Sequence, residues 1–263
     1  MSGAVPSSFR KRLQDGERVL GTFINLGSSL TAEIMAISGY DWVVLDLEHG
    51  AGDESIVVSQ LQAIGRTGTA GIVRVESLEL PRFMHALDAG ADGVLVPRLT
   101  GAADAQTAVE NTRYASRRGL AKSNRCWHWG IGARTLGEVD GEVVVAAQIE
   151  TASALREVDD IAALDGVDVL FVGPLDLSFA LGVPLQFGSA PFIDALDRVL
   201  AAAITHGKTA GILAASANLA TDYIGRGIRF VTIGSDSSML AGAVQDAFTT
   251  ARSTCHSKRQ NNQ

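Results

Sequence analysis

Apolar residues divide the chain into two alternating kinds of segment. Short runs rich in β-branched residues end in polar or glycine residues, and longer amphipathic stretches follow them. The short runs predict strands buried on both faces, and the longer stretches predict helices with one apolar side. The expected strands are Val19–Asn25, Trp42–Leu47, Gly71–Val75, Gly93–Pro97, Val143–Ile149, Val169–Val172, Ala210–Leu213 and Phe230–Ile233. The expected helices include Thr31–Ser38, Glu54–Ile64, Leu80–Ala89, Ala102–Tyr114, Ala152–Ala163, Phe192–His206, Asn218–Gly225 and Leu240–Ser253.

The order of these segments predicts an α/β fold. Eight strands, each followed by a helix, form a parallel series, and in 263 residues such a series most simply closes into a (β/α)8 TIM barrel. A doubly wound open sheet is the alternative, but no G-x-G-x-x-G follows the first strand. We therefore expect one barrel domain over residues 1–255 and a disordered polar tail over residues 256–263.

One connection breaks the alternation. The segment between Tyr114 and Val143 is long and rich in glycine, and it carries Trp127 and Trp129. Long connections inside compact domains are commonly functional. Because this one follows the fourth strand, we expect it to rise from the carboxyl-terminal end of the barrel, either as a lid or as an ordinary surface insertion.

Composition narrows the class of protein. Lys and Arg number 22 and Asp and Glu number 29, and this net charge of −7 without a basic cluster argues against a nucleic acid or an anionic membrane as partner. The two cysteines, Cys126 and Cys255, are too few for a disulfide framework, which favours a reducing cytoplasm. No secretory signal and no apolar run of membrane-spanning length is present. We expect a cytoplasmic protein.

Polar residues gather where the expected strands end. In a βα barrel the carboxyl ends of the strands surround the active site. The relevant stretches are Asp46-Leu47-Glu48-His49 after the second strand, Arg74 in the third, Gln148-Ile149-Glu150 in the fifth and Gly173-Pro174-Leu175-Asp176 after the sixth. The barrel is therefore expected to bring carboxylates, an imidazole and a guanidinium to one opening.

Glu150 and Asp176 belong to neighbouring strands. Two carboxylates without a cysteine or a second histidine form a hard, oxygen-only site, which prefers Mg²⁺ or Mn²⁺ and leaves positions for water and substrate oxygens, with Co²⁺ or Zn²⁺ as alternatives. Each acid has a structural alternative as a helix N-cap or a solvated loop residue. Asp176 is the more ambiguous of the two, because Pro174 suits the first residue of a short helix.

Two further side chains are candidates for the chemistry. Arg74, inside a β-branched run, needs a partner, either a substrate carboxylate or an internal salt bridge to Asp46 or Glu48. His49 suits a proton shuttle or a hydrogen-bonded structural residue, and His128 in the long connection is a secondary candidate. None of the four lysines lies at a strand's carboxyl end, which disfavours a Schiff-base aldolase and leaves a metal as the electron sink.

Taken together, these stretches resemble the HpcH/HpaI aldolase family. The likeness extends from Arg18 to Leu240. It is carried by Asp46-Leu47-Glu48-His49, Val73-Arg74, Val96-Pro97, Gln148-Ile149-Glu150-Thr151 and Val172-Gly173-Pro174-Leu175-Asp176-Leu177-Ser178. The family comprises metal-dependent class II pyruvate aldolases, typified by 4-hydroxy-2-oxoheptanedioate aldolase and 2-dehydro-3-deoxyglucarate aldolase.

The resemblance implies roles around the metal. Glu150 and Asp176 would hold the divalent cation, and Gln148 would support its coordination shell. His49, with Asp46 nearby, would serve the acid–base steps through a metal-bound water.

The resemblance also implies roles in substrate binding and assembly. Arg74, with the backbone around Gly173 and Leu175, would hold the carboxylate and oxo group of pyruvate. Asp88 matches an acid that the family lends to a neighbouring subunit to orient the histidine. That role presupposes a homo-oligomer, commonly a hexamer built from three dimers that exchange the last helix.

The chain departs from the family pattern at a few positions. Leu175 replaces a small alanine, and Gly50 stands where alanine is common. The stretch after Tyr114 is shortened, and the sequence of residues 124–129 is unusual. We expect these changes to lie where the acceptor aldehyde binds, so that they alter the substrate more than the core chemistry.

The implied reaction forms or cleaves a C–C bond through a pyruvate enolate, between a 4-hydroxy-2-oxo acid and pyruvate plus an aldehyde. Oxaloacetate decarboxylation and a specialised biosynthetic bond formation are variants of the same chemistry. One alternative is a CoA-ester lyase of the citrate-lyase β-subunit type, against which His49 argues. Another is a non-catalytic barrel that serves as a scaffold.

Overall fold

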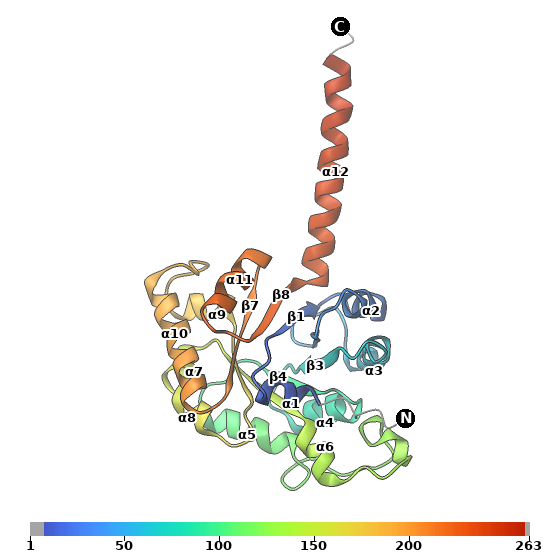
Figure 1. The fold of residues 1–263 in the computed structure, drawn as a ribbon, viewed down its shortest axis with the longest axis vertical. Coiled ribbons are helices and arrows are strands. Elements are labelled where there is room, and N and C mark those ends of the chain that lie inside the picture. Colours follow the sequence, from blue (N-terminus) through green and yellow to red (C-terminus); the bar gives the residue numbers. More distant parts are fainter. Residues whose placement is uncertain (1–7, 261–263) are drawn as a thin grey trace.

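Eight parallel strands close into a barrel in sequence order (Figure 1). The computed structural model describes the backbone of residues 8–260 and the side chains of residues 8–253. The strands are β1 (Val19–Ile24), β2 (Trp42–Asp46), β3 (Ala70–Arg74), β4 (Gly93–Val96), β5 (Val144–Ile149), β6 (Val169–Val172), β7 (Thr209–Ala214) and β8 (Phe230–Ser235). Every expected strand is present within one or two residues of its expected ends, and the TIM barrel is confirmed.

Helices cover the outside of the barrel. They are α1 (Phe9–Gln14), α2 (Ser29–Ile37), α3 (Glu54–Ile64), α4 (Leu80–Asp88), α5 (Ala102–Thr112), α6 (Leu136–Glu142), α7 (Ala152–Arg156), α8 (Val158–Ala163), α9 (Pro174–Ala180), α10 (Ala190–Thr205), α11 (Ala217–Gly225) and α12 (Asp236–Gln260), with a 3₁₀ helix, η1 (Arg125–Gly130). The helix expected over Ala152–Ala163 is divided at Glu157, whose backbone leaves the helical region. The helices α1 and α6 and the helix η1 were not expected, because such short segments carry little periodicity.

Large aromatic residues fill the barrel interior. Trp42 and Phe230 lie with their ring centroids 3.8 Å apart, and Phe171 meets Phe230 edge-on. A Cβ at Gly21 of β1 would collide with the indole of Trp42, so glycine is needed to make room for this ring. The interior is therefore a packed core, and open space is left only towards the strand ends.

Helix α1 closes the amino-terminal end of the barrel. The ring of Phe9 lies 6.5 Å from that of Trp42 and 6.2 Å from that of Phe230. Arg10 Nε donates to Asp168 Oδ1 at 2.8 Å, and Arg12 donates to Asp41 at 2.6 Å. These aspartates directly precede β6 and β2, so the two ion pairs hold α1 across the end of the barrel.

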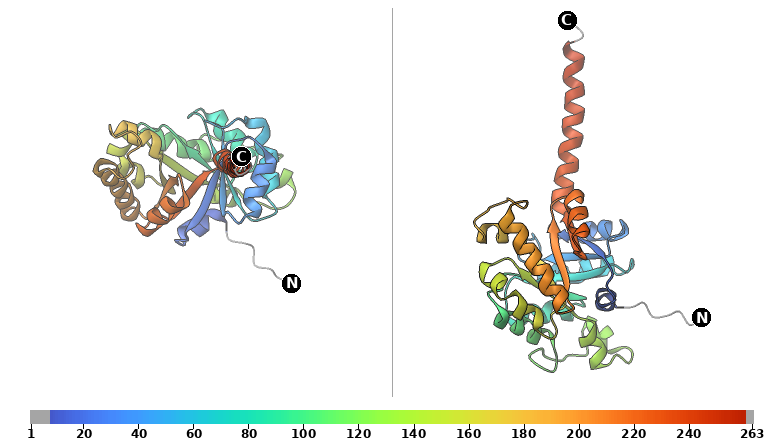
Figure 2. Two further views of the ribbon diagram at one scale, coloured as in Figure 1. Left: turned by 90° about the horizontal axis from the view of Figure 1, so that it is seen from above. Right: turned by 60° about the vertical axis from the view of Figure 1, so that its left-hand side comes forward.

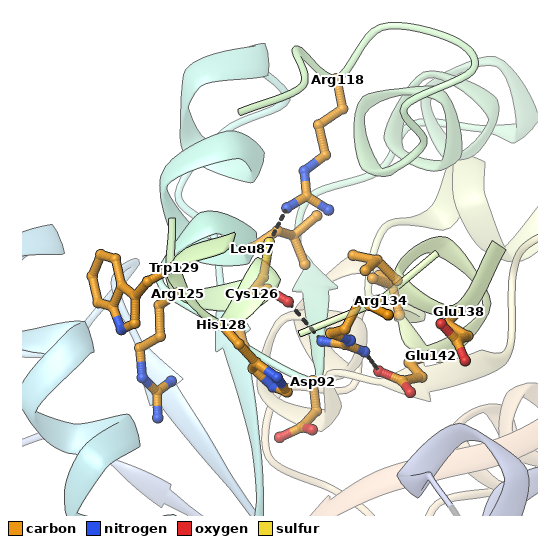
Figure 3. Close-up of a pocket in the computed structure, with 15 residues that line it drawn as sticks. Leu87, Asp92, Arg118, Arg125, Cys126, His128, Trp129, Arg134, Glu138 and Glu142 are labelled. Atoms are coloured by element: carbon orange, nitrogen blue, oxygen red, sulfur yellow. Dashed lines mark hydrogen bonds and ion pairs between the residues drawn. The ribbon is translucent and has the colours of Figure 1, made fainter. Parts of the chain in front are cut away.

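The long connection between Tyr114 and Val143 lies at the amino-terminal end of the barrel, whereas the sequence predicted it at the carboxyl-terminal end. Helix α5 returns the chain to the amino-terminal end, and residues 113–143, with η1 and α6, come after this helix. Arg125 Nη1 donates to Ala89 O beyond α4, and Arg10 of α1 donates to Gly141 O. Together with the end of α4 and the residues just before β4, the segment borders a cavity of about 820 Å³ (Figure 3). The prediction of a lid over the carboxyl-terminal strand ends of the same subunit is therefore wrong. The prediction that residues 124–129 lie beside the aldehyde at those strand ends is wrong for the same reason.

Helix α12 projects away from the barrel as a straight rod (Figures 1 and 2). It contains the expected helix Leu240–Ser253 and continues to Gln260, into the stretch predicted as a polar tail, of which residues 261–263 lie outside the described residues. Its residues Leu240, Val244 and Phe248 are exposed and lie on one face at spacings of four. No helix within residues 8–260 has the length and apolar character to cross a membrane.

Phe9→Ala should destabilise the protein more than an exposed truncation, because it opens the packed end of the barrel. We expect a loss of about 3 kcal/mol and a fall in Tm of several degrees, measured by thermal unfolding. Leu120→Ala, at a side chain that is 55% exposed, is the control and should leave Tm almost unchanged. Equal effects of the two substitutions would contradict a structural role for α1.

Candidate active site

A cavity of about 410 Å³ opens at the carboxyl-terminal ends of the strands. The predicted site residues that line it are His49, Arg74, Gln148, Glu150, Gly173, Leu175 and Asp176. Asp46 does not line the cavity but pairs with Arg74, and Asp88 lies at the end of α4, away from the cavity. Closure of the barrel thus brings residues from distant parts of the chain around one opening, as expected for this architecture.

Glu150 follows β5 and is held by two N–H donors, although its side chain is almost fully buried. Its Oε1 accepts the backbone N–H of Arg98 at 2.6 Å, and its Oε2 accepts a hydrogen bond from Gln148 Nε2. Arg98 adopts a φ of 57°, a left-handed conformation that is uncommon for a residue other than glycine. Gln148 Oε1 is buried without a partner in the described part of the chain. The carboxylate of Glu150 is therefore fixed in orientation before any ligand binds.

Asp176 lies in the first turn of α9, at the rim of the same cavity. It is exposed and makes no hydrogen bond or salt bridge with another described residue, so it does not cap the helix. Burial raises the pKa of Glu150, against the hydrogen bonds from Arg98 and Gln148, and the negative charge of Asp176 raises it further. The two carboxylates are therefore close enough to repel each other, a repulsion that a divalent cation between them would relieve.

The residues around this pair fit a hard divalent cation. A Cβ at Gly173 would lie 2.5 Å from Glu150 Oε2 and 2.9 Å from Gln148 Nε2, so glycine leaves room beside the carboxylate. No group of three or more His, Cys, Asp and Glu residues able to hold a metal occurs among the described residues. A cation held here would have the two carboxylates as its protein donors, with the other positions left to water and substrate oxygens, as Mg²⁺ and Mn²⁺ sites commonly have. Leu175, 52% exposed, lines the cavity without filling it.

Arg74 at the end of β3 forms a buried bidentate ion pair with Asp46 at the end of β2. Its Nε and Nη2 lie 2.8 and 2.7 Å from the two carboxylate oxygens of Asp46. Its Nη1 lies 3.4 Å from Glu48 Oε2, and its guanidinium lies 4.9 Å from the ring centroid of Phe23. The internal salt bridge considered from the sequence is present, with both acids. Because Arg74 also lines the cavity, the pair holds the guanidinium plane fixed at its wall.

His49 points into solvent at the mouth of the cavity. Its side chain is 62% exposed, and its Nε2 lies 3.8 Å from Glu48 Oε2. Asp46 reaches His49 only through the backbone, accepting its N–H at 3.2 Å. Burial raises the pKa of Glu48, and the positive charge of Arg74 opposes this effect. The acid nearest the imidazole is thus Glu48, its neighbour in the chain, and Asp46, which the resemblance implied beside His49, accepts only the backbone N–H.

Asp88 lies at the far end of α4, beside the amino-terminal end of the barrel. Its Oδ1 accepts a hydrogen bond of 2.8 Å from Arg118, a fully buried side chain that also lies over the ring of Tyr114. His49 and Asp88 therefore occupy opposite ends of one subunit. A role for Asp88 at the histidine of a neighbouring subunit stays a prediction. His128 lines the cavity near Asp88 and is likewise away from the strand ends.

Sequence reasoning did not identify Arg98 or Asn25, which both follow strand ends. Arg98 contacts Glu150 through its backbone N–H, and the type of a residue does not reveal a backbone contact. The sequence marked Arg98 only by its position after Pro97, at the end of a strand. Asn25 lines the cavity directly after β1. A systematic scan of the first residues after each strand would have found both.

Comparison with known proteins agrees with this geometry. The family model described as HpcH/HpaI aldolase/citrate lyase matches residues 19–243. The 4-hydroxy-2-oxovalerate aldolase of Rhodococcus jostii (strain RHA1) is 37% identical over 242 residues, which cover 89% of this chain and 92% of that protein. The hydroxypyruvate/pyruvate aldolase of Paraburkholderia phytofirmans (strain DSM 17436 / LMG 22146 / PsJN) is 34% identical over 255 residues, which cover 93% of this chain and 97% of that protein.

A solved structure is similar over the same extent. The crystal structure of an HpcH/HpaI aldolase/citrate lyase family protein from Burkholderia cenocepacia J2315 has a TM-score of 0.88 and 37% sequence identity, and covers 92% of this chain and 98% of its own. The family match spans all eight strands, and the relatives are matched over nearly their full length. The resemblance noted from the strand-end motifs is thus confirmed, and the chain belongs to the HpcH/HpaI aldolase/citrate lyase family.

Proposed function

We propose that this chain is a divalent-metal-dependent pyruvate aldolase that interconverts a 4-hydroxy-2-oxo acid with pyruvate and an aldehyde. The observation that carries the proposal is the single cavity lined by Glu150, Asp176, Arg74 and His49. The names of the two relatives, both aldolases and one of them a pyruvate aldolase, support it. A scaffold without activity would have no need of a buried carboxylate held by two donors.

Arg74 binds the carboxylate of the 2-oxo acid. Its Nε and one N–H of Nη2 are taken by Asp46, and Nη1 lies 3.4 Å from Glu48 Oε2, so the remaining N–H groups of the two Nη atoms are the donors for the substrate. Because Asp46 holds the guanidinium plane, little side-chain entropy is lost when the substrate binds. Phe23 covers one face of the guanidinium and excludes water from it.

Glu150 and Asp176 hold the cation, Mg²⁺ or Mn²⁺. When bound, such a cation supplies Lewis-acid stabilisation of the negative charge that develops on the 2-oxo oxygen. Gln148 and the backbone of Arg98 keep Glu150 oriented. Gly173 keeps the space beside this carboxylate open.

His49 moves the proton in the cleavage direction. It takes the proton of the 4-hydroxyl as the C3–C4 bond breaks, the aldehyde leaves, and the electron pair of that bond forms the enolate of pyruvate. A proton then returns to C3 and gives pyruvate. Loss of carbon dioxide from oxaloacetate passes through the same enolate, so the site also suits that reaction.

Exchange of the methyl protons of pyruvate in deuterated water tests the enolate directly, without any aldehyde. With Mg²⁺ or Mn²⁺ added, we expect NMR to show exchange that EDTA abolishes. Glu150→Gln should slow exchange at least about a hundredfold, because it removes a charged ligand and turns an amide NH₂ towards one of the two donors that now hold the carboxylate.

Glu33→Gln is the matched control for the exchange experiment. Glu33 is exposed on α2 and lies outside the cavity, so this variant should exchange like the native protein. Exchange that survives both EDTA and the Glu150 substitution would overturn the metal assignment. A complete lack of exchange in the metal-loaded native protein would overturn the proposed function.

Cation binding should weaken at acid pH. Burial and the charge of Asp176 raise the pKa of Glu150, so this group keeps its proton above the usual range of a carboxyl, and a cation must displace that proton. We expect the Kd for Mn²⁺, measured by calorimetry from about pH 7.5 to about pH 5, to rise about tenfold per unit below that pKa. A Kd that stays constant over this range would contradict competition between cation and proton.

The oligomer that the family pattern implies is also part of the proposal. Helix α12 exposes Leu240, Val244 and Phe248, and α2 beside its base exposes Leu30, Ile34 and Ile37. Exposed apolar faces of this kind mark protein interfaces. In the proposed dimer each subunit lends α12 to its partner, and three such dimers form a hexamer.

Val244→Asp combined with Phe248→Asp should dissociate the oligomer, since each buries a carboxylate in the proposed apolar contact. Light scattering after size exclusion should show a fall in mass. Asp246→Lys changes the charge of the opposite face of the same helix and should leave the mass unchanged. A native protein that is monomeric at micromolar concentration would contradict the exchange.

A further inference from the structure

The wall of the active-site cavity at the ends of β1 and β8 carries one polar group that the proposed chemistry does not use. Phe23 and Ser235 are register partners on these two strands, and Asn25 follows two residues later in the chain. Asn25 lines the cavity, and its Oδ1 is buried without a hydrogen-bond partner in the described part of the chain. Leaving a buried amide oxygen unpaired is unfavourable, so the oxygen is a candidate acceptor for a ligand.

The backbone of Asn25 is held from both sides. Its N–H donates to Asp236 Oδ1 at 2.7 Å, and its carbonyl accepts the N–H of Ala51 at 2.7 Å. Asp236 is itself buried in the first turn of α12 and also accepts a hydrogen bond of 2.6 Å from Thr31. The backbone that carries the Asn25 side chain is therefore fixed before a ligand arrives, which lowers the entropic cost of using this residue.

The serines beside Asn25 are engaged with one another. Ser235 Oγ accepts the backbone N–H of Ser238 at 3.1 Å, and Ser238 Oγ accepts that of Ser235 at 3.0 Å. These reciprocal bonds close the start of α12. Asn25 is thus the polar group on this wall that stays available to a ligand.

The other lining residues restrict the ligand further. Arg74 is the one guanidinium or ammonium group among the described residues that line the cavity, and it matches one carboxylate. The side chains of Leu175, Leu213 and Phe171 make the remaining wall apolar. A second carboxylate at the far end of the substrate would be left there without a cation, at a cost in desolvation.

We propose that Asn25 selects the acceptor aldehyde by accepting a hydrogen bond from its hydroxyl group, so that the aldehyde is a short, neutral hydroxyaldehyde. This inference rests on the proposed aldolase function and assigns its substrate class. The carbon chain of the aldehyde lies against the apolar wall, and its hydroxyl donates to Asn25 Oδ1. A polar group that is satisfied only by the right substrate discriminates more strongly than an apolar contact of the same size.

Glycolaldehyde and propanal test this proposal, because they differ by a hydroxyl in place of a methyl group. The experiment measures kcat/KM of each aldehyde in the reaction that joins it to pyruvate. It uses the metal-loaded full-length protein. Native protein should favour glycolaldehyde, and Asn25→Ala should lower the ratio of the two kcat/KM values about tenfold. The ratio cancels any general loss of activity or stability.

Leu26→Ala is the control, because Leu26 follows Asn25 in the same loop but does not line the cavity. It should leave the ratio at the native value. An unchanged ratio in Asn25→Ala, or a native preference for propanal, would overturn the role of Asn25. Methyl-proton exchange of pyruvate by the native protein separates failure of the proposed aldolase function from failure of the role of Asn25. It reports the enolate whether or not any aldehyde is accepted.

Discussion

The carboxylate of Glu150 is the group on which the proposed site depends. It is 4% exposed, and it carries its charge inside the protein only because Gln148 and the backbone of Arg98 donate to it. Asp176 adds a second negative charge nearby without a balancing partner. Two acids in this arrangement cost free energy in the protein alone, and the proposed cation would recover that cost. An unfavourable pair of this kind is expected at a functional site, and in the proposed site Gly173 leaves room beside Glu150 while the Gln148 amide orients it.

The two ends of the barrel have different tasks. At the amino-terminal end, α1 places Phe9 on the aromatic core and pairs Arg10 and Arg12 with the aspartates before β6 and β2, so this end is closed and structural. At the carboxyl-terminal end the strands lead into the turns that line the cavity, where Asp176 and the Oδ1 of Asn25 have no hydrogen-bond partner among the described residues. This separation lets the cavity carry strained or unpaired groups, such as Arg98 and Asn25, while the packed end holds the fold together.

Helix α12 would connect the site to the proposed oligomer. Its first turn contains Asp236, which binds the backbone of Asn25 and Leu26 at the cavity wall, and its later turns project from the barrel with apolar residues exposed. In the proposed oligomer, a contact of α12 with another subunit would therefore act on an element that also positions the cavity wall.

The sequence by itself determined the barrel and most of the site. Buried parallel strands require continuous apolar runs, and these end where polar residues begin, so both the strands and the candidates Glu150, Asp176, Arg74 and His49 could be predicted from local pattern. Only the tertiary structure decided which partners these side chains have. It paired Arg74 with Asp46, and it used a backbone N–H of Arg98 for Glu150. It also put residues 113–143 at the far end of the barrel, because a helix reverses the chain before that segment begins. Local pattern sets which residues form an element and which side is buried, whereas contacts between elements depend on how the closed barrel arranges them in space.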